Sequence, residues 1–166
     1  MPDLVIDVMR REDLADVLAI EVVSFSTPWT EEMFTHELAG GVPGTTLVAR
    51  LPAPGAPAAV AGYVCVWVVS DELHINNLAV HPRWRRRGLA RALVRAALEH
   101  GQRERAHLAF LEVRASNVAA QRLYREFDFE AVGLRRRYYT HPIEDAVIMR
   151  RVGLWALDAE QHVMER

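Results

Sequence analysis

Apolar positions recur at helical spacing in four segments of the chain. Together with capping residues they predict helices at residues 14–25, 30–38, 89–101 and 117–126. The second helix starts after Thr30 and stops before Gly40, and Gly101 is expected to end the third. Ser116 or Asn117 caps the fourth, because either side chain can accept a hydrogen bond from the first turn.

Apolar runs between these helices predict the strands. One lies near the N-terminus, and the others lie at residues 45–51, 60–69, 73–80, 107–113, 127–133 and 144–152. The order is therefore β-α-α-β-β-β-α-β-α-β-β, which indicates the α+β (mixed α/β) class, with a central, mostly antiparallel sheet flanked by about four helices. Leu51–Ala59, rich in Pro, Gly and Ala, is expected to form an exposed hairpin loop.

The length of 166 residues, 51% of them hydrophobic, predicts one domain with a proper core. We assign residues 1–153 to that domain and residues 154–166 to a C-terminal tail. The tail carries apolar side chains at several positions. A docking helix, a partner contact and a frayed end all fit this pattern, so the role of the tail stays open.

Charge and residue types exclude several classes of protein. The net charge of −2 argues against strong non-specific nucleic-acid binding, and no direct DNA binding is expected. No apolar run reaches the length of a membrane span, and the N-terminal segment lacks the pattern of a signal peptide, so we expect a cytoplasmic protein without a membrane partner. Cys65 is the single cysteine and the histidines lack metal-ligand spacing, so no metal is expected.

A basic turn between the strand at 73–80 and the helix that starts at Leu89 carries the strongest local signal. Backbone N–H groups and the positive end of the helix meet there, which suits a pyrophosphate. Gly88 would let phosphate approach the backbone closely, and Ala90 keeps the next contact small. Counter-charge would come from Arg85, Arg86, Arg87 and Arg91. On spacing alone, such a basic turn before a helix is more often a solvated surface than a phosphate site.

The residues of this turn resemble a known signature. VHPRWRRRGLARAL is similar to the acetyl-CoA motif Arg/Gln-x-x-Gly-x-Gly/Ala of the GCN5-related N-acetyltransferases, with Arg85, Gly88 and Ala90 in the motif positions. LEVRASNVAAQRLYREFDFEAVGLRRRYY and the later EDAVIM resemble the bacterial ribosomal-protein-alanine N-acetyltransferases of the RimI type. The resemblance spans residues 13–149. Asp128 stands where the family has a glycine, and an aspartate tolerates the left-handed backbone.

The resemblance implies acetyl-CoA as co-substrate and a cytoplasmic N-acetyltransferase with the GNAT fold. The backbone of Leu78, Ala79 and Val80 would pair with the pantetheine like an added strand. Tyr124 would protonate the leaving thiolate as general acid. The remaining cofactor-binding residues would be Arg85, Arg86, Arg87, Gly88, Leu89, Ala90, Arg91 and Asn117.

Glu112 is the candidate general base. It lies in the middle of a strand, and Leu111 and Val113 point to the opposite face. Phe110 on the same face would raise the pKa of the Glu112 carboxyl, which is the direction that a general base requires. The alternative is a structural ion pair with Arg114, two residues further along the same face. The family resemblance favours the base.

The acceptor side has weaker signals. Trp29, Tyr138 and Tyr139 match the substrate-loop positions of the family, although Trp29 fits plain core packing nearly as well. Residues 135–137, all arginine, fit either a solvated turn or an acidic or RNA-bearing partner.

The acceptor implied by the resemblance is a protein N-terminus, in particular the N-terminal alanine of a small-subunit ribosomal protein. One alternative is acetylation of a small amine or a lysine side chain. A second, from a different class, is a non-catalytic module that binds RNA or the ribosome through its arginines.

Overall fold

In the part of the chain that the structure describes, seven strands and four α-helices form in the order that the hydrophobic pattern predicts. The structure, a computed structural model, describes residues 3–40 and 43–154, so the predicted tail lies outside the described residues from residue 155 onward. The strands are β1 (Val5–Val8), β2 (Gly44–Ala53), β3 (Ala56–Val69), β4 (Glu72–Val80), β5 (Leu108–Arg114), β6 (Glu130–Thr140) and β7 (Ile143–Val152). The helices are α1 (Leu14–Ser24), α2 (Glu31–Leu38), α3 (Leu89–Arg103) and α4 (Val118–Glu126), with 3-10 turns at Arg11–Asp13 and Pro82–Trp84.

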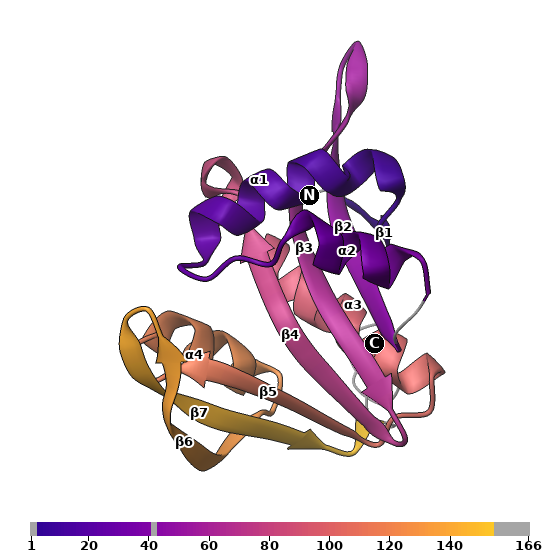
Figure 1. Cartoon of the computed structure of the whole chain (residues 1–166). Coiled ribbons are helices and arrows are strands. Elements are labelled where there is room, and N and C mark those ends of the chain that lie inside the picture. The colour runs from indigo at the N-terminus through magenta and orange to yellow at the C-terminus, as the bar shows by residue number, and fades with distance from the viewer. Residues whose placement is uncertain (1–2, 41–42, 155–166) are drawn as a thin grey trace. The chain divides into compact units, whose positions relative to one another are not determined.

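The strands form one sheet in the order β1-β2-β3-β4-β5-β7-β6 (Figure 1). The pairs β1–β2, β2–β3, β5–β7 and β6–β7 are antiparallel, whereas β4 and β5 run parallel. The parallel register extends from Glu72 opposite Leu108 to Ile75 opposite Leu111. The mixed, mostly antiparallel sheet expected from the sequence is confirmed.

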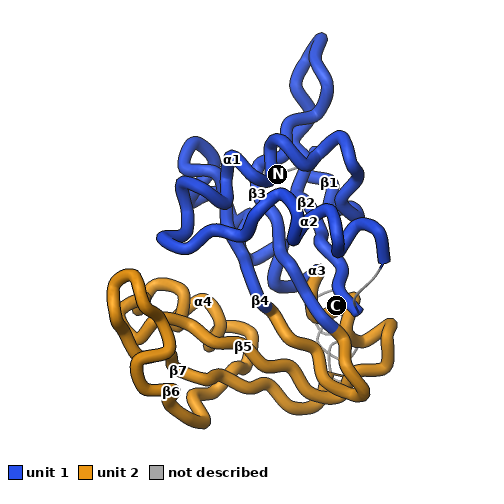
Figure 2. Tube along the Cα trace, viewed as in Figure 1, with its two compact units in different colours: residues 1–67, 76–96 blue, residues 68–75, 97–166 orange. Residues whose placement is uncertain are grey.

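Contacts divide the chain into two compact units, shown in different colours in Figure 2. Unit 1 comprises residues 1–67 and 76–96, and unit 2 comprises residues 68–75 and 97–166. Both β4 and α3 therefore begin in one unit and end in the other. None of the helices in the described part of the chain is long and apolar enough to span a membrane.

The core of unit 1 packs on both faces of β3. Tyr63 and Cys65 belong to a cluster that includes Val17 and Ile20 of α1 and Phe34 of α2. On the other face, Gly62 lies so close to Leu93 of α3 that an added Cβ would stand 3.1 Å from it. Burial on both faces explains why β3 reads as a continuous apolar run.

The N-terminal helix caps expected from the sequence are confirmed for α2 and α4. The Thr30 side chain accepts a hydrogen bond from the Met33 amide, and Asn117 accepts one from Ala120. Asp128 adopts φ +62, the left-handed conformation expected where the family has glycine.

The Pro-Gly-Ala segment forms more strand than the sequence suggests. β2 continues to Ala53 and β3 starts at Ala56, so the turn consists of Pro54 and Gly55. Backbone pairing needs no apolar side chain, and the register shift between Leu51 and Ala53 accommodates a proline in the ladder. The expected nine-residue loop is therefore wrong in extent, although the hairpin itself is confirmed.

Unit 2 packs its core on one face of β5. Ala109, Leu111 and Val113 are buried, and the residues between them are half-buried. Gly101 was expected to end α3, which is wrong, because the helix continues to Arg103. A Cβ at Gly101 would stand 2.9 Å from the Leu73 side chain, so this glycine lets α3 pack closely on β4.

Candidate active site

The backbone of the basic turn adopts left-handed conformations at two positions. Arg86 has φ +62 and Gly88 has φ +80, directly before α3 begins at Leu89. An added Cβ at Gly88 would meet no atom of the described chain within 4 Å. The glycine is therefore required by the backbone angle, and the space beside it is open. The first amides of α3 lack partners inside the helix and can donate to an anion there.

The arginines of the turn are partly engaged by the chain itself. Arg85 Nε donates to the Val80 carbonyl at 3.2 Å. The guanidinium carbons of Arg83 and Arg87 lie 5.4 and 5.0 Å from the Trp84 ring centre. These contacts orient positive charge around the start of α3 and favour an anion beside it.

Leu78, Ala79 and Val80 lie at the end of β4, beside β3. A Cβ at Gly62 would stand 2.9 Å from the Ala79 carbonyl oxygen. Gly62 therefore allows β3 to approach this end of β4, a role that the sequence alone did not reveal. The His81 amide also donates to the Ala61 carbonyl at 2.8 Å, which fixes the exit of the strand.

Glu112 projects from the half-buried face of β5, as the alternation predicts. Its Oε1 lies 2.9 Å from Arg135 Nε, and it also accepts a hydrogen bond from the Tyr138 hydroxyl. Arg114, the partner considered in the sequence, instead bonds Glu144 at 3.3 Å and the carbonyls of His141 and Pro142. The ion pair of Glu112 is thus with a residue of β6.

The two adjacent tyrosines of β6 differ in their surroundings. The Tyr138 side chain is 49% exposed, and its hydrogen bond to Glu112, followed by burial, raises its pKa. Tyr139 is half-buried under the guanidinium of Arg114, 4.2 Å from the ring centre. Burial and the nearby Tyr138 and Glu112 raise the pKa of Tyr139 to about 12. Both phenols stay protonated at neutral pH.

Tyr124 lies on α4 and is buried against Phe129, with ring centres 5.8 Å apart. Burial, with a smaller contribution from Tyr139, raises its pKa to about 12. A phenol in this state holds its proton at neutral pH and can donate it. Asn117 lies at the start of the same helix as its cap, so both predicted residues of α4 belong to unit 2.

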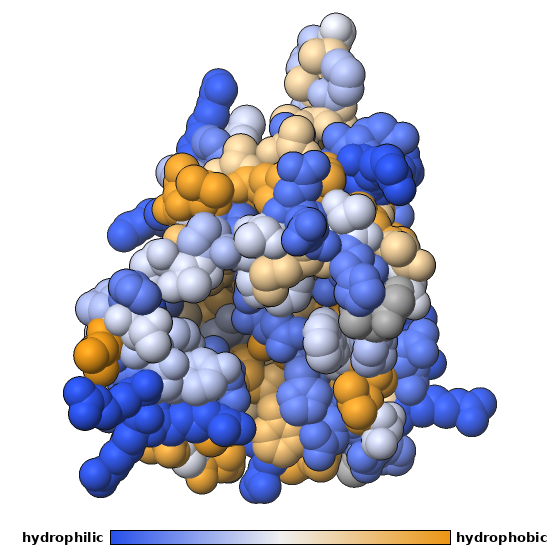
Figure 3. Space-filling view, viewed as in Figure 1, coloured by the Kyte–Doolittle hydropathy of each residue, from blue (hydrophilic) through white to orange (hydrophobic). Residues whose placement is uncertain are grey.

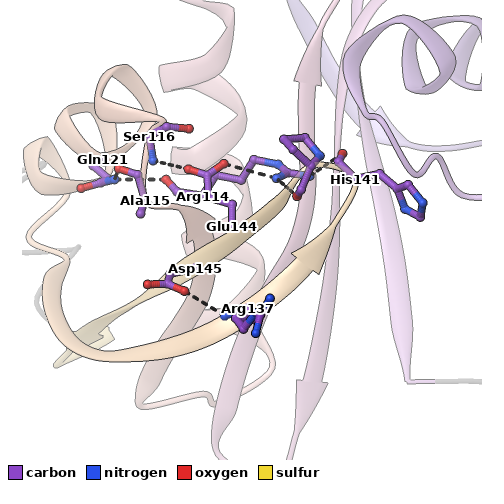
Figure 4. A network of polar contacts seen from close by, with 9 residues as sticks. Arg114, Ala115, Ser116, Gln121, Arg137, His141, Glu144 and Asp145 are labelled. Carbon is purple, nitrogen blue, oxygen red and sulfur yellow. Dashed lines mark hydrogen bonds and ion pairs between the residues drawn. The ribbon is translucent and has the colours of Figure 1, made fainter.

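A polar network joins the end of β5 to the β6–β7 hairpin (Figure 4). Glu144 accepts from the Ser116 amide at 2.6 Å. Hydrogen bonds from the Ser116 side chain and amide, together with Arg114, lower the pKa of Glu144. Asp145 accepts from the Arg137 amide at 2.8 Å. Gln121 donates to the carbonyls of Arg114 and Ala115. The acidic residues of EDAVIM therefore fix the backbone around Glu112 and the tyrosines.

Trp29 is partly buried and packs against the core of unit 1. Its ring centre lies 5.2 Å from that of Phe34, and its amide donates to Glu21 at 2.9 Å. Glu21 is fully buried and also accepts from Asn77, at 2.9 Å, and from the Tyr63 hydroxyl. Glu21 could not be identified from the sequence, because a helical glutamate gives no signal of the three donors, two of them far along the chain, that satisfy its carboxylate.

The geometry fits an anionic, extended ligand in unit 1 and proton transfer in unit 2. The open space beside Gly88 at the start of α3 suits a diphosphate, and the end of β4 suits an extended chain that pairs with its backbone. Within residues 3–40 and 43–154, no group of three His, Cys, Asp or Glu side chains is arranged to hold a metal ion.

Replacing Gly88 by alanine tests the turn. The left-handed angle at φ +80 makes the wild-type backbone costly for alanine by about 1–2 kcal/mol, so we expect the KM for acetyl-CoA, the co-substrate that the sequence motif implies, to rise roughly tenfold. Gly55→Ala is the matched control, since Gly55 has φ +74 and open space at the hairpin turn. Both variants should melt at lower temperature, and steady-state kinetics should show the higher KM in Gly88→Ala alone. An equal KM in the two variants would remove the turn from acetyl-CoA binding.

Comparison with known proteins gives a consistent result. Residues 14–129 match the acetyltransferase (GNAT) family. The [ribosomal protein bS18]-alanine N-acetyltransferase of Escherichia coli is 36% identical over 143 residues, covering 85% of this chain and 92% of that protein. The N-alpha-acetyltransferase RimI of Mycobacterium tuberculosis is 33% identical over 159 residues, covering 88% and 90%.

A solved structure agrees with these relatives. The crystal structure of the ribosomal-protein-S18-alanine N-acetyltransferase from Escherichia coli superposes with a TM-score of 0.77 at 32% identity, covering 90% of this chain and 93% of that one. The resemblance inferred from the two sequence motifs is confirmed. These relatives also favour an enzyme over the non-catalytic RNA-binding alternative.

Proposed function

The chain belongs to the acetyltransferase (GNAT) family, and from that premise we propose that it transfers the acetyl group of acetyl-CoA to the N-terminal amine of a protein. The acceptor we propose is the N-terminal alanine of ribosomal protein bS18, the substrate named for its Escherichia coli relative. One observation carries the chemistry: unit 2 holds a half-exposed carboxylate, Glu112, and a buried, protonated phenol, Tyr124.

Unit 1 binds the co-substrate in this proposal. Amides at Gly88 and at the start of α3 donate to the diphosphate, with charge from residues 85–87 and Arg91. The backbone of residues 78–80 pairs with the pantetheine arm and donates toward the thioester carbonyl. Acetyl-CoA supplies the thioester carbon that the amine attacks and the sulfur that leaves.

Unit 2 moves the protons. Glu112 accepts a proton from the amine as the N–C bond forms, and Tyr124 gives its hydroxyl proton to the sulfur as the C–S bond breaks. Asn117 caps α4 and so fixes the helix that carries Tyr124. Transfer is direct, because Cys65 is buried in unit 1 and burial raises the pKa of its thiol well above the ordinary value.

An α-amine suits a single carboxylate base. Its pKa of about 7.7–8.0 leaves roughly a tenth neutral at pH 7, whereas a lysine amine near 10.4 is neutral in less than about one molecule in a thousand. One carboxylate is therefore enough as the base for a protein N-terminus. This difference supports the α-amine acceptor over a lysine side chain. Trp29, Tyr138 and Tyr139 stay proposed as acceptor-binding residues.

A peptide panel tests the proposed acceptor. The protein is incubated with acetyl-CoA and the N-terminal peptide of bS18 from the same organism, and the products are read by mass spectrometry. We expect one added acetyl group, located on the α-nitrogen of alanine. The control peptide is identical but N-terminally blocked and carries one lysine. Acetylation of that lysine at a comparable rate would overturn the proposed specificity.

A further inference from the structure

The carboxylate of Glu112 is held by two side chains of another strand. Arg135 Nε lies 2.9 Å from its Oε1, and the Tyr138 hydroxyl donates to the same carboxylate. The guanidinium carbon of Arg135 also lies 5.9 Å from the Tyr138 ring centre. The three side chains form a cluster inside unit 2, in which one acceptor has two donors.

An irregularity in β6 brings both donors to Glu112. Residues three apart in a regular strand point to opposite faces of the sheet. Between Arg135, opposite Ala146, and Tyr139, opposite Glu144, β6 has two more residues than β7. Arg137 accommodates the two extra residues by adopting a left-handed conformation with φ +52, and its amide donates a hydrogen bond to Asp145. The bulge therefore lets Tyr138 reach the carboxylate that Arg135 holds.

β7 lies between β5 and β6 in the sheet and leaves space for the Arg135 guanidinium to reach Glu112. Ala146 of β7 pairs with Arg114 on one side and with Arg135 on the other. Its small, fully buried side chain lets the Arg135 side chain cross β7 toward Glu112. Arg114 is held by Glu144, so it serves a different carboxylate. The three residues of the EDA motif thus fix Arg114, the bulge and the crossing of Arg135.

We propose that Arg135 is a positioning residue for the general base, which it holds in one orientation toward the acceptor amine. The inference rests on the proposed function, since it concerns how Glu112 acts in that reaction. A glutamate side chain on a half-exposed strand face samples several rotamers. Two donors from β6 restrict it to one, and the remaining carboxylate lone pairs stay available to the amine.

A residue that positions the base and a residue that stabilises the fold differ in whether their loss affects turnover or the melting temperature. The Arg135 side chain is 55% exposed and that of Glu112 is 29% exposed, and such exposed pairs add little to folding stability. General-base catalysis, in contrast, depends steeply on the placement of the base. Arg135 should therefore affect turnover strongly and the melting temperature weakly.

The test is a double-mutant cycle in kcat. Arg135→Met should lower kcat about tenfold in the wild-type background and leave the KM for acetyl-CoA unchanged. In the Glu112→Gln background, the same substitution should change kcat by less than about twofold, because the base that it positions is gone. Arg135→Lys should recover part of the loss, since the ammonium can still bond the carboxylate.

Arg136→Met is the matched control. Arg136 is the adjacent, exposed arginine of the same strand, so the variant loses the same charge in the same bulge. It should keep wild-type kcat. Equal losses in Arg135→Met and Arg136→Met, or an additive cycle, would overturn the positioning role while leaving the proposed function in place. If the wild-type protein acetylates no peptide α-amine, the proposed function fails first and this inference fails with it.

Discussion

Glu112→Gln is expected to lower kcat at pH 7 by about 10²–10⁴-fold, the usual range for loss of a general base. Glutamine keeps the shape of the side chain and can still accept from Arg135 Nε and Tyr138, but it cannot take the proton of the amine. Because Glu112 is not among the residues proposed to bind acetyl-CoA, the KM for acetyl-CoA should stay close to that of the wild type. Initial rates of thiol release with a free α-amine peptide measure both quantities.

The pH dependence gives the control for this variant. Raising the pH from 7 to 9 converts more of the acceptor into neutral amine for the wild type and the variant alike, so both rates should rise while the deficit of Glu112→Gln persists. Near-wild-type turnover at pH 7 would remove Glu112 from the role of base. The melting temperature should change little, because the residue is half-exposed.

Tyr124→Phe is expected to lower kcat by about 10²-fold, at the lower end of the range for general acid–base catalysis. Phenylalanine keeps the ring that packs on Phe129, so the fold should be preserved. Only the donor to the leaving sulfur is lost. Steady-state kinetics with saturating acetyl-CoA and peptide measure the effect, and an unchanged kcat would mean that Tyr124 serves packing alone.

The raised pKa of Tyr124 fixes the sign of its pH dependence. Burial raises the pKa to about 12, so the hydroxyl holds its proton below that pH and loses it only above. The deficit of Tyr124→Phe should therefore be constant from pH 6 to pH 9. The Tyr138→Phe control changes a phenol on β6 that bonds Glu112, and its effect should depend on Glu112 being present.

Features that depend on neighbours in sequence could be predicted. The alternation Phe110-Leu-Glu-Val places Glu112 on the half-buried face of β5, because successive side chains of a strand point to opposite faces. The Asn117 cap and the left-handed Asp128 follow from the same kind of local rule. Gly88 was identified from its place in a basic turn before a helix, where glycine lets phosphate approach the backbone, and its φ of +80 adds a second reason for glycine.

Features that depend on distant partners could not be predicted. The sequence offered Arg114 as the partner of Glu112, yet a bulge in β6 brings Arg135 and Tyr138 to that carboxylate. Gly101 looks like a helix terminator in sequence but contacts Leu73. Glu21 gave no signal, because its three donors come from other parts of unit 1. In each case the deciding contact joins segments far apart in the chain.

In the proposed reaction, one acyl transfer uses Gly88 and the start of α3 for the diphosphate, Glu112 for the amine and Tyr124 for the sulfur. A crystal structure with coenzyme A and an alanine-starting peptide tests it most directly. We expect the diphosphate on the amides at Gly88, the Tyr124 hydroxyl within hydrogen-bond distance of the sulfur, and Glu112 within reach of the α-nitrogen directly or through one water. A diphosphate bound elsewhere, or either side chain remote from its reacting atom, would contradict it.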